Sequence, residues 1–586
     1  MILVFGGTTE GRKAVEVLEE GGSLYFYSTK TGEQDITLHH GQRIDGALDA
    51  KAMRTFCGEH DIRLIVDAAH PFASQLHLTI AQVSESLNIP TIRYERIYPE
   101  HDSEITWIDD YSQIPRDIHS LLATTGVQSI SKLKPLEVAG VKVFYRILNR
   151  ESSIALAQKQ GASPEQLCYY ENPQDIPVEA EVILLKESGL SGGFQEKVEA
   201  AKARGMRIIA LKRPQTPAIF TIVNGPYGLR RMVEKLLPEF YPLHSGLTTG
   251  TCATAATVAA TINLLKNETP EEVPILLPNG ETIHVSVGYG DGYAYCIKDA
   301  GDDPDVTDGL EIRVSVKPIA ADTPTRSRSG SFEILGGEGV GVFTLPGFDY
   351  PPGSPAINKA PREMIRQNLA EITSDSLSIT ISVPEGETIA KRTFNPRLGI
   401  EGGISIIGVS GIVKPFSEEA FIDSIRKCMT IAKASGSSRV VINSGGKSER
   451  FVKALYPNLP QQAFVEYGNY IGETLKIAHE LGIREVTLGV MLGKAVKLAA
   501  GHLDTHSRKA TMDKAFISEM LHEAGCQANL EKITLARELW QAIPPDKTED
   551  FCRVVLQHCM NHCHPLVPQA RLTLLLIDDD GIIHSQ

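Results

Sequence analysis

Short apolar runs alternate with amphipathic helical stretches along most of this sequence. Residues 1–5 are apolar, residues 12–20 have helical spacing, and residues 63–67 form another apolar run. The same rhythm returns in residues 404–407 and 440–446, where each apolar run ends in a glycine turn. Short apolar runs followed by turns and helices are typical of strands in an α/β sheet. We therefore predict an α/β fold for both halves of the chain.

The sequence changes character near residue 240. Residues 238–242 read Pro-Glu-Phe-Tyr-Pro, and residues 244–260 then pass from a Thr/Gly loop into an alanine-rich helix. Two nearby prolines are poorly suited to a continuing helix or strand. A chain of 586 residues also exceeds what one hydrophobic core supports. We predict a two-lobed Rossmann-like unit, an α+β substrate region and an α/β cofactor-binding region, with the bounds 1–240 (lobes about 1–120 and 121–240), 241–395 and 396–586.

Composition excludes several classes of function. The net charge of −14 argues against nucleic acid as a partner. No apolar run approaches the length of a membrane span, and the glycines after residue 5 cut off a signal-like segment. Nine scattered cysteines favour reduced thiols in the cytoplasm. We expect a cytoplasmic protein with a small anionic ligand, for which a homo-oligomeric state stays open.

The first apolar run leads into a candidate nucleotide site. Strand, glycine turn and helix N-terminus form a phosphate cradle, although GGTTEG at residues 6–11 does not have the G-x-G-x-x-G spacing. The next strand ends in Ser28, Thr29 and Lys30, where an NAD site usually has an acid, so we predict NADPH. A second glycine loop opens another helix near residue 190. The predicted NADPH residues are Gly6, Gly7, Thr8, Thr9, Glu10, Gly11, Ser28, Thr29, Lys30, Ser188, Gly189, Gly192 and Gly193.

Charged side chains follow other predicted strands of the first half. Asp67 and His70 lie at one strand end, where open α/β sheets bind ligands, and are candidate proton donors. A helix cap at Asp67 and a packed histidine are the structural alternative. Four basic residues at similar positions suggest a pocket for carboxylates: Arg93, Arg96, Arg146 and Lys186.

The second half contains an acidic segment, KDAGDDPDVTDG, at residues 298–309. Its spacing does not match an EF-hand loop. It is either an Asx-rich turn or a group of carboxylates that receives pyrrole N–H donors or a cation. We include it in the predicted substrate site, with hydroxyls at the helix start and polar groups near glycine turns. These residues are Thr248, Thr249, Thr251, Asp299, Asp302, Asp303, Asp305, Asn358, Arg362, Asn395 and Arg397.

Several of these motifs carry a family resemblance. GGTTEG, DAAHPFA, the SGLSGG loop and IIALKRP resemble precorrin-6A reductase. LTTGTCATAA, DAGDDPDVT and the later glycine turns resemble the cobalt-precorrin-5B (C1)-methyltransferase family of anaerobic cobalamin synthesis. The resemblance implies C1 methylation with S-adenosylmethionine, followed by NADPH-dependent reduction of the methylated corrinoid. Ala69 and Val490 depart from the families' usual threonine and histidine.

The resemblance also assigns the second cofactor. The strand-to-glycine turns of the last region suit a nucleoside-like ligand, and the family implies that it is S-adenosylmethionine. The predicted residues are Gly408, Ser410, Gly411, Asn443, Gly445, Gly446, Asn469, Gly472, Gly493 and Lys494. His506 matches the family's Thr-His-Ser and is a catalytic candidate. His502 and His506 have metal-ligand spacing, yet a capping or core role is commoner, and the HCMNHCH tail fits no zinc pattern, so we predict no metal.

Two alternatives to a bifunctional corrinoid enzyme remain at this point. One is an NADP-linked reductase of another anionic metabolite, fused to an unrelated enzyme. The other is a non-catalytic carrier of a tetrapyrrole or cobalt, with the aspartates and the His/Cys tail as ligands. A carrier has no need of two nucleotide-binding turns, which argues against it.

Overall fold

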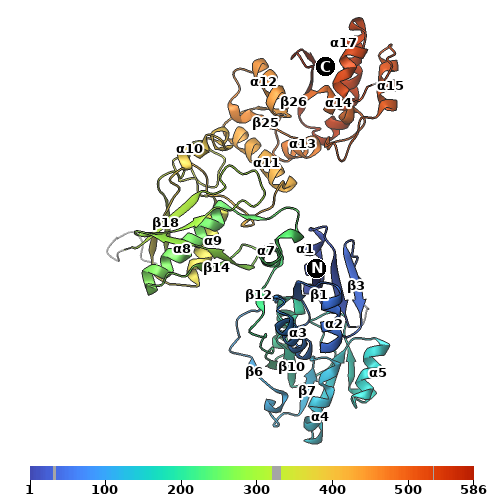
Figure 1. The fold of residues 1–586 in the computed structure, drawn as a ribbon, viewed down its shortest axis with the longest axis vertical. Coiled ribbons are helices and arrows are strands. Elements are labelled where there is room, and N and C mark those ends of the chain that lie inside the picture. Colours follow the sequence, from blue (N-terminus) through green and yellow to red (C-terminus); the bar gives the residue numbers. More distant parts are fainter. Residues whose placement is uncertain (31–33, 320–330, 532, 586) are drawn as a thin grey trace. The chain divides into compact units, whose positions relative to one another are not determined.

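The computed structural model describes residues 1–586 except residues 31–33, 320–330, 532 and 586. The chain divides into two compact units. One comprises Met1–Ser245 and Pro274–His284, and the other comprises Gly246–Val273 and Val285–Gln586. Figure 1 shows the elements of each unit along the chain. Among the residues described, no helix is both long and apolar enough to cross a membrane.

The first unit begins with a six-stranded parallel sheet between two helical layers. The strand order is β12 (Thr221–Val223), β5 (Thr91–Tyr94), β4 (Leu64–Asp67), β1 (Ile2–Phe5), β2 (Tyr25–Thr29) and β3 (Gly41–Asp45). Alternate side chains of β1 pack on opposite faces. One face is covered by α1 (Thr9–Glu19) and α7 (Pro226–Leu236), and the other by α2 (Ala50–Glu59) and α3 (Ser74–Leu87). This alternation explains why β1 is apolar throughout.

A second six-stranded parallel sheet follows the same plan. Its order is β6 (Thr106–Ile108), β11 (Arg207–Leu211), β10 (Val182–Lys186), β7 (Ser120–Ala123), β8 (Lys142–Ile147) and β9 (Leu167–Tyr169). It packs against α4 (Ile130–Val138), α5 (Glu151–Lys159) and α6 (Phe194–Ala203). The chain then returns to the first sheet, where β12 forms the edge next to β5. The predicted parallel α/β architecture of the first half is confirmed.

Both sheets have the strand order of a Rossmann fold, so each has a point where the chain reverses its direction of progress. In the first sheet this point lies between β1 and β4, and in the second it lies between β7 and β10. Loops at the carboxyl ends of such neighbouring strands run in opposite directions and leave a crevice for ligands. Candidate sites in the first unit are therefore expected at these two places.

The second unit begins with a mixed sheet around a long buried helix. Helix α8 (Thr249–Lys266) packs against α9 (Lys359–Ala370), β17 and β18. The sheet order is β16 (Gly288–Gly290), β17 (Tyr293–Ile297), β18 (Glu311–Pro318), β21 (Leu377–Ser382) and β19 (Phe332–Gly336), of which only β19 and β21 pair in parallel. Shorter elements are β13 (Gly246–Leu247), β23 (Ile412–Val413), β20 (Val342–Phe343), β22 (Ile400–Glu401) and α10 (Gly386–Ala390).

The last region is another α/β layer. Four parallel strands and one antiparallel edge strand have the order β25 (Phe464–Glu466), β24 (Arg439–Asn443), β26 (Glu485–Met491), β27 (Arg571–Ile577) and β28 (Ile583–Ser585). Helix α12 (Gly446–Leu455) packs on one face. The other face carries α11 (Glu418–Ala434), α13 (Ile471–Glu480), α14 (Leu492–Ala499), α15 (Lys514–Glu523), α16 (Leu539–Ala542) and α17 (Thr548–Cys563). The direction of progress reverses between β24 and β26.

A two-stranded hairpin, β14 (Glu272–Leu276) and β15 (Thr282–Ser286), follows α8 in sequence, and its central part, Pro274–His284, belongs to the first unit. The buried Glu281 carboxylate accepts hydrogen bonds from the backbone N–H groups of Tyr227 (2.8 Å) and Gly228 (3.1 Å). Both N–H groups belong to the first turn of α7, which is where a carboxylate stabilises a helix.

Candidate functional site

The glycine turn after β1 lies at the switch point of the first sheet. Gly7 has φ of +89°, a left-handed conformation that favours glycine. Thr8 caps α1, because its hydroxyl oxygen accepts a hydrogen bond from the Gly11 N–H at 3.0 Å. The same hydroxyl donates to the Ala68 carbonyl at 2.7 Å. Thr8 therefore joins the turns that follow β1 and β4, the two strands of the switch point.

Part of this predicted cradle is already used inside the protein. The Gly7 N–H lies 3.1 Å from the Tyr27 hydroxyl and 3.2 Å from Gln34 Oε1. A Cβ atom on Gly6 would lie 2.1 Å from the Tyr27 hydroxyl, so packing on Tyr27 requires a glycine there. Gln34 thus stands where an anionic ligand would accept from the Gly7 amide.

The strand end proposed for the 2′-phosphate is only partly accessible. Ser28 and Thr29 are buried, and the Thr29 hydroxyl donates to Asp45 Oδ1 at 3.0 Å. Lys30 is exposed. Arg43, which also pairs with Asp45 at 2.9 Å, adds a second positive charge that sequence inspection missed. Lys30 and Arg43 are thus the cations that this edge of the sheet offers.

Asp67 lies at the centre of a buried ionic network rather than on a free surface. Its exposed fraction is 0%, and that of Arg93 is 1%. Asp67 Oδ1 accepts from Arg93 Nη1 at 3.0 Å, and Oδ2 lies 2.6 Å from His77 Nδ1. His77 Nε2 lies 3.1 Å from the His70 carbonyl oxygen. Both His77 nitrogens thus face oxygen atoms, one on Asp67 and one on the His70 backbone, and the network holds the His70 loop in place.

His70 itself is accessible. Its Nδ1 accepts a hydrogen bond from the Phe72 N–H at 3.2 Å, so a neutral ring carries its proton on Nε2. The surrounding protein lowers the pKa of His70 to about 4 by desolvation, and the charges of Arg96 and Lys186 lower it further. At neutral pH His70 is therefore a neutral hydrogen-bond donor among positive charges, an arrangement suited to an anionic ligand.

The second glycine loop of the first unit meets helix α1. Arg96 is buried and pairs with the buried Glu10 at 2.8 Å. Arg96 Nη1 also donates to the Ser188 carbonyl at 2.7 Å, and the Ser191 hydroxyl donates to Glu10. A Cβ on Gly192 would lie 2.6 Å from Arg96, and Gly189 and Gly193 have positive φ. This loop, predicted to bind NADPH, thus contacts Arg96, which was predicted to bind substrate.

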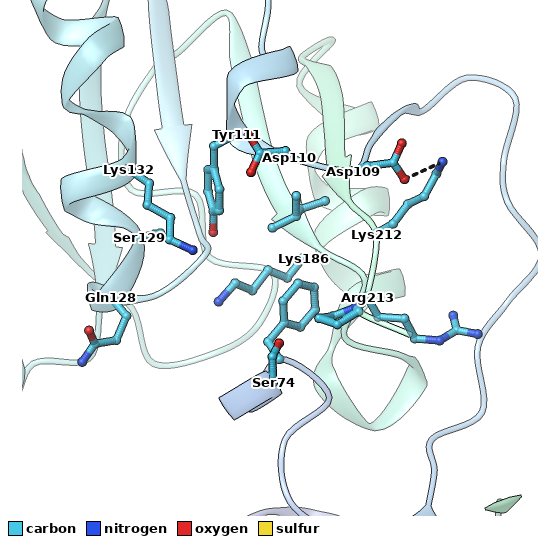
Figure 2. A pocket seen from close by; sticks show the side chains of 13 residues that line it. Ser74, Asp109, Asp110, Tyr111, Gln128, Ser129, Lys132, Lys186, Lys212 and Arg213 are labelled. Carbon is cyan, nitrogen blue, oxygen red and sulfur yellow. Dashed lines mark hydrogen bonds and ion pairs between the residues drawn. The ribbon is translucent and has the colours of Figure 1, made fainter. Parts of the chain in front are cut away.

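The switch point of the second sheet contains a pocket with a volume of about 430 Å³. Figure 2 shows the side chains that line it, including Lys186 at the end of β10 and Lys132 on α4. Arg146 is not among them, and its buried guanidinium donates to the Pro173 and Asp175 carbonyls at 2.7 and 2.5 Å. Of the predicted carboxylate ligands, Lys186 is therefore the one that lines this pocket.

In the second unit, the threonines at the start of α8 bond to a glycine loop. Thr251 Oγ1 donates to the Gly411 carbonyl at 2.6 Å, and Thr249 Oγ1 accepts from the Ile407 N–H at 2.9 Å. A Cβ on Gly408 would lie 2.2 Å from the Thr248 hydroxyl. Sequence inspection assigned Thr248, Thr249 and Thr251 to substrate but Gly408, Ser410 and Gly411 to cofactor. The structure instead packs Gly408 and Gly411 against these threonines and fills the helix N-terminus with the chain's own groups.

The acidic segment is built from turns. Asp305 Oδ1 accepts from the Thr307 N–H at 2.8 Å, and Asp299 Oδ1 accepts from the Gly301 N–H at 2.8 Å. Asp303 Oδ1 accepts from the Phe416 N–H at 3.0 Å. Asp305 also pairs with the buried Lys298 at 3.1 Å. These bonds agree with the Asx-turn alternative. In Asp299, Asp303 and Asp305 these backbone hydrogen bonds use only Oδ1 of the carboxylate.

Three other predicted substrate residues differ in whether their side chains bond within the protein. Arg362 donates to the Ile357 and Ile334 carbonyls at 2.9 and 3.2 Å. Asn395 donates to the Gly403 carbonyl at 3.1 Å. Asn358 begins α9, and its buried Oδ1 has no hydrogen-bond partner among the described residues. Asn358 is thus the one of these three with a polar atom left unsatisfied.

The switch point of the last sheet brings together several predicted cofactor residues. Asn443 Oδ1 accepts from the Gly445 N–H at 2.8 Å at the end of β24. A Cβ on Gly445 would lie 2.2 Å from Glu466 Oε1 at the end of β25. Burial raises the pKa of Glu466, as does the charge of Glu449, whereas Arg397 and Lys494 lower it. Gly493 and Lys494 lie at the start of α14, directly after β26. Asn443, Glu466 and Lys494 thus lie near one another at this switch point.

The loop that contains His506 lies beside the loop after β25. The Thr505 N–H donates to the Asn469 carbonyl at 3.0 Å, and the Gly472 N–H donates to the Leu503 carbonyl at 3.0 Å. His506 Nδ1 accepts from the Arg508 N–H at 3.1 Å, so a neutral His506 carries its proton on Nε2. The residue before His506 in this loop therefore contacts Asn469.

Comparisons with known proteins extend this picture. Residues 238–415 match the CbiD family, and residues 1–225 match the family described as precorrin-6x reductase CbiJ/CobK. The cobalt-precorrin-5B C(1)-methyltransferase of Prosthecochloris aestuarii is 41% identical over 357 residues, which cover 58% of this chain and 95% of that protein. The chain belongs to the cobalt-precorrin-5B C(1)-methyltransferase family. A precorrin-6x reductase domain precedes the methyltransferase part, and the fusion predicted from sequence is confirmed.

Two solved structures are also similar to parts of this methyltransferase family member. The cobalamin biosynthesis protein CbiD from Archaeoglobus fulgidus is 29% identical, with a TM-score of 0.26, and the match covers 46% of this chain and 83% of that chain. The CobK precorrin-6A reductase is 16% identical, with a TM-score of 0.33, and the match covers 40% of this chain and 96% of that chain.

Several residues beside the predicted sites of this methyltransferase–reductase fusion were missed. His77 lies on the buried face of α3 and contacts Asp67 at the end of β4, and the helical periodicity of α3 could have indicated that it faces inward. Glu466 ends a strand about 20 residues after a glycine turn, the spacing of a ribose-binding acid. For the parts of the chain described, no group of three or more His, Cys, Asp or Glu could hold a metal ion. Cys559 and Cys563, which belong to the His/Cys tail, lie on the buried face of α17 in the hydrophobic core.

Proposed function

We propose that this chain is a bifunctional enzyme of cobalamin biosynthesis. Its second unit methylates C1 of cobalt-precorrin-5B with S-adenosylmethionine, and its first unit reduces the resulting cobalt-precorrin-6A to cobalt-precorrin-6B with NADPH. The observation that carries the proposal is the match over 95% of a curated methyltransferase, next to a precorrin-6x reductase match in residues 1–225 of the same chain. The two activities would thus act in succession on one corrinoid.

For the methyl donor, the crevice between β24 and β26 is the best-supported place. Its residues fit a nucleoside, because a glycine turn ends β24 and the acid Glu466 ends the neighbouring strand β25. Glu466 would accept hydrogen bonds from the ribose hydroxyls, and Lys494 would face the carboxylate of the methionine part. The bound sulfonium supplies an already activated methyl group. The protein's own contribution is to orient the two ligands and exclude water.

For NADPH, the turn after β1 is the best-supported place. Gly7 has the left-handed conformation that such a turn uses, and Lys30 and Arg43 supply positive charge near the end of the neighbouring strands. Gln34 would leave the Gly7 amide when a phosphate binds there. The nicotinamide supplies a hydride. The Nε2–H of His70 would donate to the bound corrinoid, and the buried Asp67–His77 pair would hold the His70 loop.

The two half-reactions can be tested separately in one chain. Transfer of a labelled methyl group to cobalt-precorrin-5B reports the second unit, and anaerobic oxidation of NADPH by cobalt-precorrin-6A reports the first. We expect Glu466→Gln to lower methyl transfer by about tenfold by removing a charged hydrogen-bond acceptor, while reduction continues. We expect Gly7→Val, which strains a residue at φ of +89°, to do the reverse.

Each variant is the control for the other. Loss of both activities in either variant would indicate unfolding, and unfolding is checked by thermal denaturation. The cofactor assignments would be contradicted if both variants kept both activities. The proposed function would be contradicted if the unmodified chain neither methylated nor reduced the corrinoids.

A further inference from the structure

The pocket at the switch point of the second sheet has no role in the cofactor assignments above. It lies at the carboxyl ends of β7, β10 and β11 and has a volume of about 430 Å³. Ligands of α/β sheets bind at such a position. Its walls combine cationic and apolar side chains, among them Lys132, Lys186, Phe72 and Leu211.

Two lysines enter this pocket without an acidic partner. Figure 2 shows the ammonium groups of Lys132 and Lys186 and the hydroxyl of Tyr111 directed toward the same space. Lys186 Nζ lies 4.8 Å from the Phe72 ring centroid, and Lys132 Nζ lies 5.2 Å from that of Tyr111. In the described parts of the chain, neither lysine has a carboxylate within ion-pair distance. Two converging like charges repel each other, and an anion between them relieves that repulsion.

The acids at the rim do not neutralise these lysines. Asp109 pairs with Lys212 at 3.1 Å, on the side of the pocket away from Lys132. Asp110 Oδ1 accepts from the Ser112 N–H at 2.9 Å and so caps its own turn. Desolvation lowers the pKa of Lys186 to about 8, and the nearby charge of Lys132 adds to this effect. Hydrogen bonds from Ser112 lower the pKa of Asp110, and the charge of Lys132 makes a smaller contribution, so Asp110 lies near Lys132. Among the described residues, neither Lys132 nor Lys186 forms an ion pair with it.

The pocket is also close to the reactive part of the first unit. Phe72, which contacts Lys186, is two residues from His70, and the charge of Lys186 lowers the pKa of His70. A molecule that reaches His70 therefore extends toward Lys186. The apolar wall of Phe72 and Leu211 suits a short alkyl chain, and the lysines suit its charged end.

We propose that this pocket binds a carboxylate side chain of the corrinoid that the first unit reduces, with Lys132 and Lys186 as its ligands. This inference rests on the proposed reductase function and adds the site that orients the substrate beside His70. Lys132 becomes a substrate-binding residue that sequence inspection did not identify. The cofactor's phosphates bind elsewhere, at the turn after β1.

The test compares Lys132→Gln with Lys212→Gln in the full chain. Lys212 lines the same pocket but already pairs with Asp109 at 3.1 Å, so it is the matched control. Binding is measured by calorimetry with cobyrinic acid, a stable cobalt corrinoid with free carboxyl groups, and with NADPH. We expect Lys132→Gln to weaken corrinoid binding by about tenfold, Lys132→Arg to restore it, and Lys212→Gln to leave it unchanged. NADPH affinity should stay at the wild-type value in all three variants.

Three results would contradict the proposal. If Lys132→Gln and Lys212→Gln bind the corrinoid equally well, the pocket does not hold a carboxylate. If Lys132→Gln weakens NADPH binding instead, the pocket holds a cofactor phosphate. If the unmodified chain binds NADPH but no corrinoid, the reductase function fails together with this site, a result distinct from the first two. Because Lys132 is exposed on α4, its replacement should leave thermal unfolding unchanged, which the same samples verify.

Discussion

Replacing Asp67 with asparagine separates a structural role of this carboxylate from a role as proton donor. Asp67 has an exposed fraction of 0% and bonds to Arg93 at 3.0 Å and His77 at 2.6 Å. Asparagine keeps the shape and one acceptor oxygen but loses the charge. Arg93 then retains Glu95 at 3.3 Å as its carboxylate partner, while His77 loses its own.

The magnitude follows from this burial. Removing one partner of a buried ion pair costs about 3–5 kcal/mol, because the remaining charges stay desolvated. Arg93 keeps one partner, so we expect the lower end, about 3 kcal/mol. In a unit of this size each kcal/mol lowers the melting temperature by about 2–4 °C, which gives a decrease of about 6–12 °C. Hydride transfer should fall as well, since His77 no longer fixes the His70 carbonyl.

The assay is calorimetric unfolding of the full chain, in which the transition of the first unit is identified by its shift with NADPH. His70→Gln is the matched control, because His70 is exposed and its replacement should change stability by less than about 0.5 kcal/mol. If Asp67→Asn melts with the wild-type protein but loses hydride transfer, the network argument is wrong. Asp67 would then act on the substrate directly, as the sequence suggested.

Three further predictions follow from the same sites. Lys30→Glu should weaken NADPH binding by about tenfold and leave NADH binding nearly unchanged, and equal wild-type affinity for both would contradict the 2′-phosphate assignment. Because the pKa of His70 is lowered to about 4, His70 stays neutral at pH 5–8, and kcat/KM for reduction should lose a low-pH limb near pH 4 in His70→Gln. Asp305→Asn should cost about 3 kcal/mol by leaving the buried Lys298 unpaired. Burial opposes ionisation of Asp305, but Lys298 and Thr307 outweigh it and lower its pKa. The contribution to stability is therefore full above the pKa of the unfolded state and is lost as pH falls through the lower pKa of the folded state. Urea titrations of the wild type and Asp305→Asn should thus converge in acid.

The local parts of the fold could be predicted from the sequence. Apolar runs followed by glycine turns identified β1 and β24 with the turns that end them, because these signals extend over a few neighbouring residues. The turn after β1 and the turn after β24 both lie at switch points, where ligands bind. That these turns lie at switch points follows from the strand order and could not be predicted from the residues of each turn alone.

Partners distant in sequence could not be predicted in this way. Gly408 resembles a nucleotide-binding glycine in its own segment, but its neighbour is Thr248 in a different element. Packing against Tyr27 is sufficient to require a glycine at position 6. The Gly7 N–H donates to Gln34, which lies outside the GGTTEG motif. The chain leaves the second sheet and adds β12 to the first sheet next to β5, and no short stretch of sequence indicates this return.

The hairpin Pro274–His284 shows why order along the chain is a poor guide to the limits of the two enzymes. It follows α8, an element of the second unit, yet it belongs to the first unit. Its Glu281 supplies the acceptor for two N–H groups at the start of α7, and burial raises the pKa of that carboxyl. The first unit is therefore complete only after part of the second has been synthesised. A break between Leu243 and Leu247 would place these donors and their acceptor on separate fragments, so we expect the first unit to be less stable when the chain is cut there.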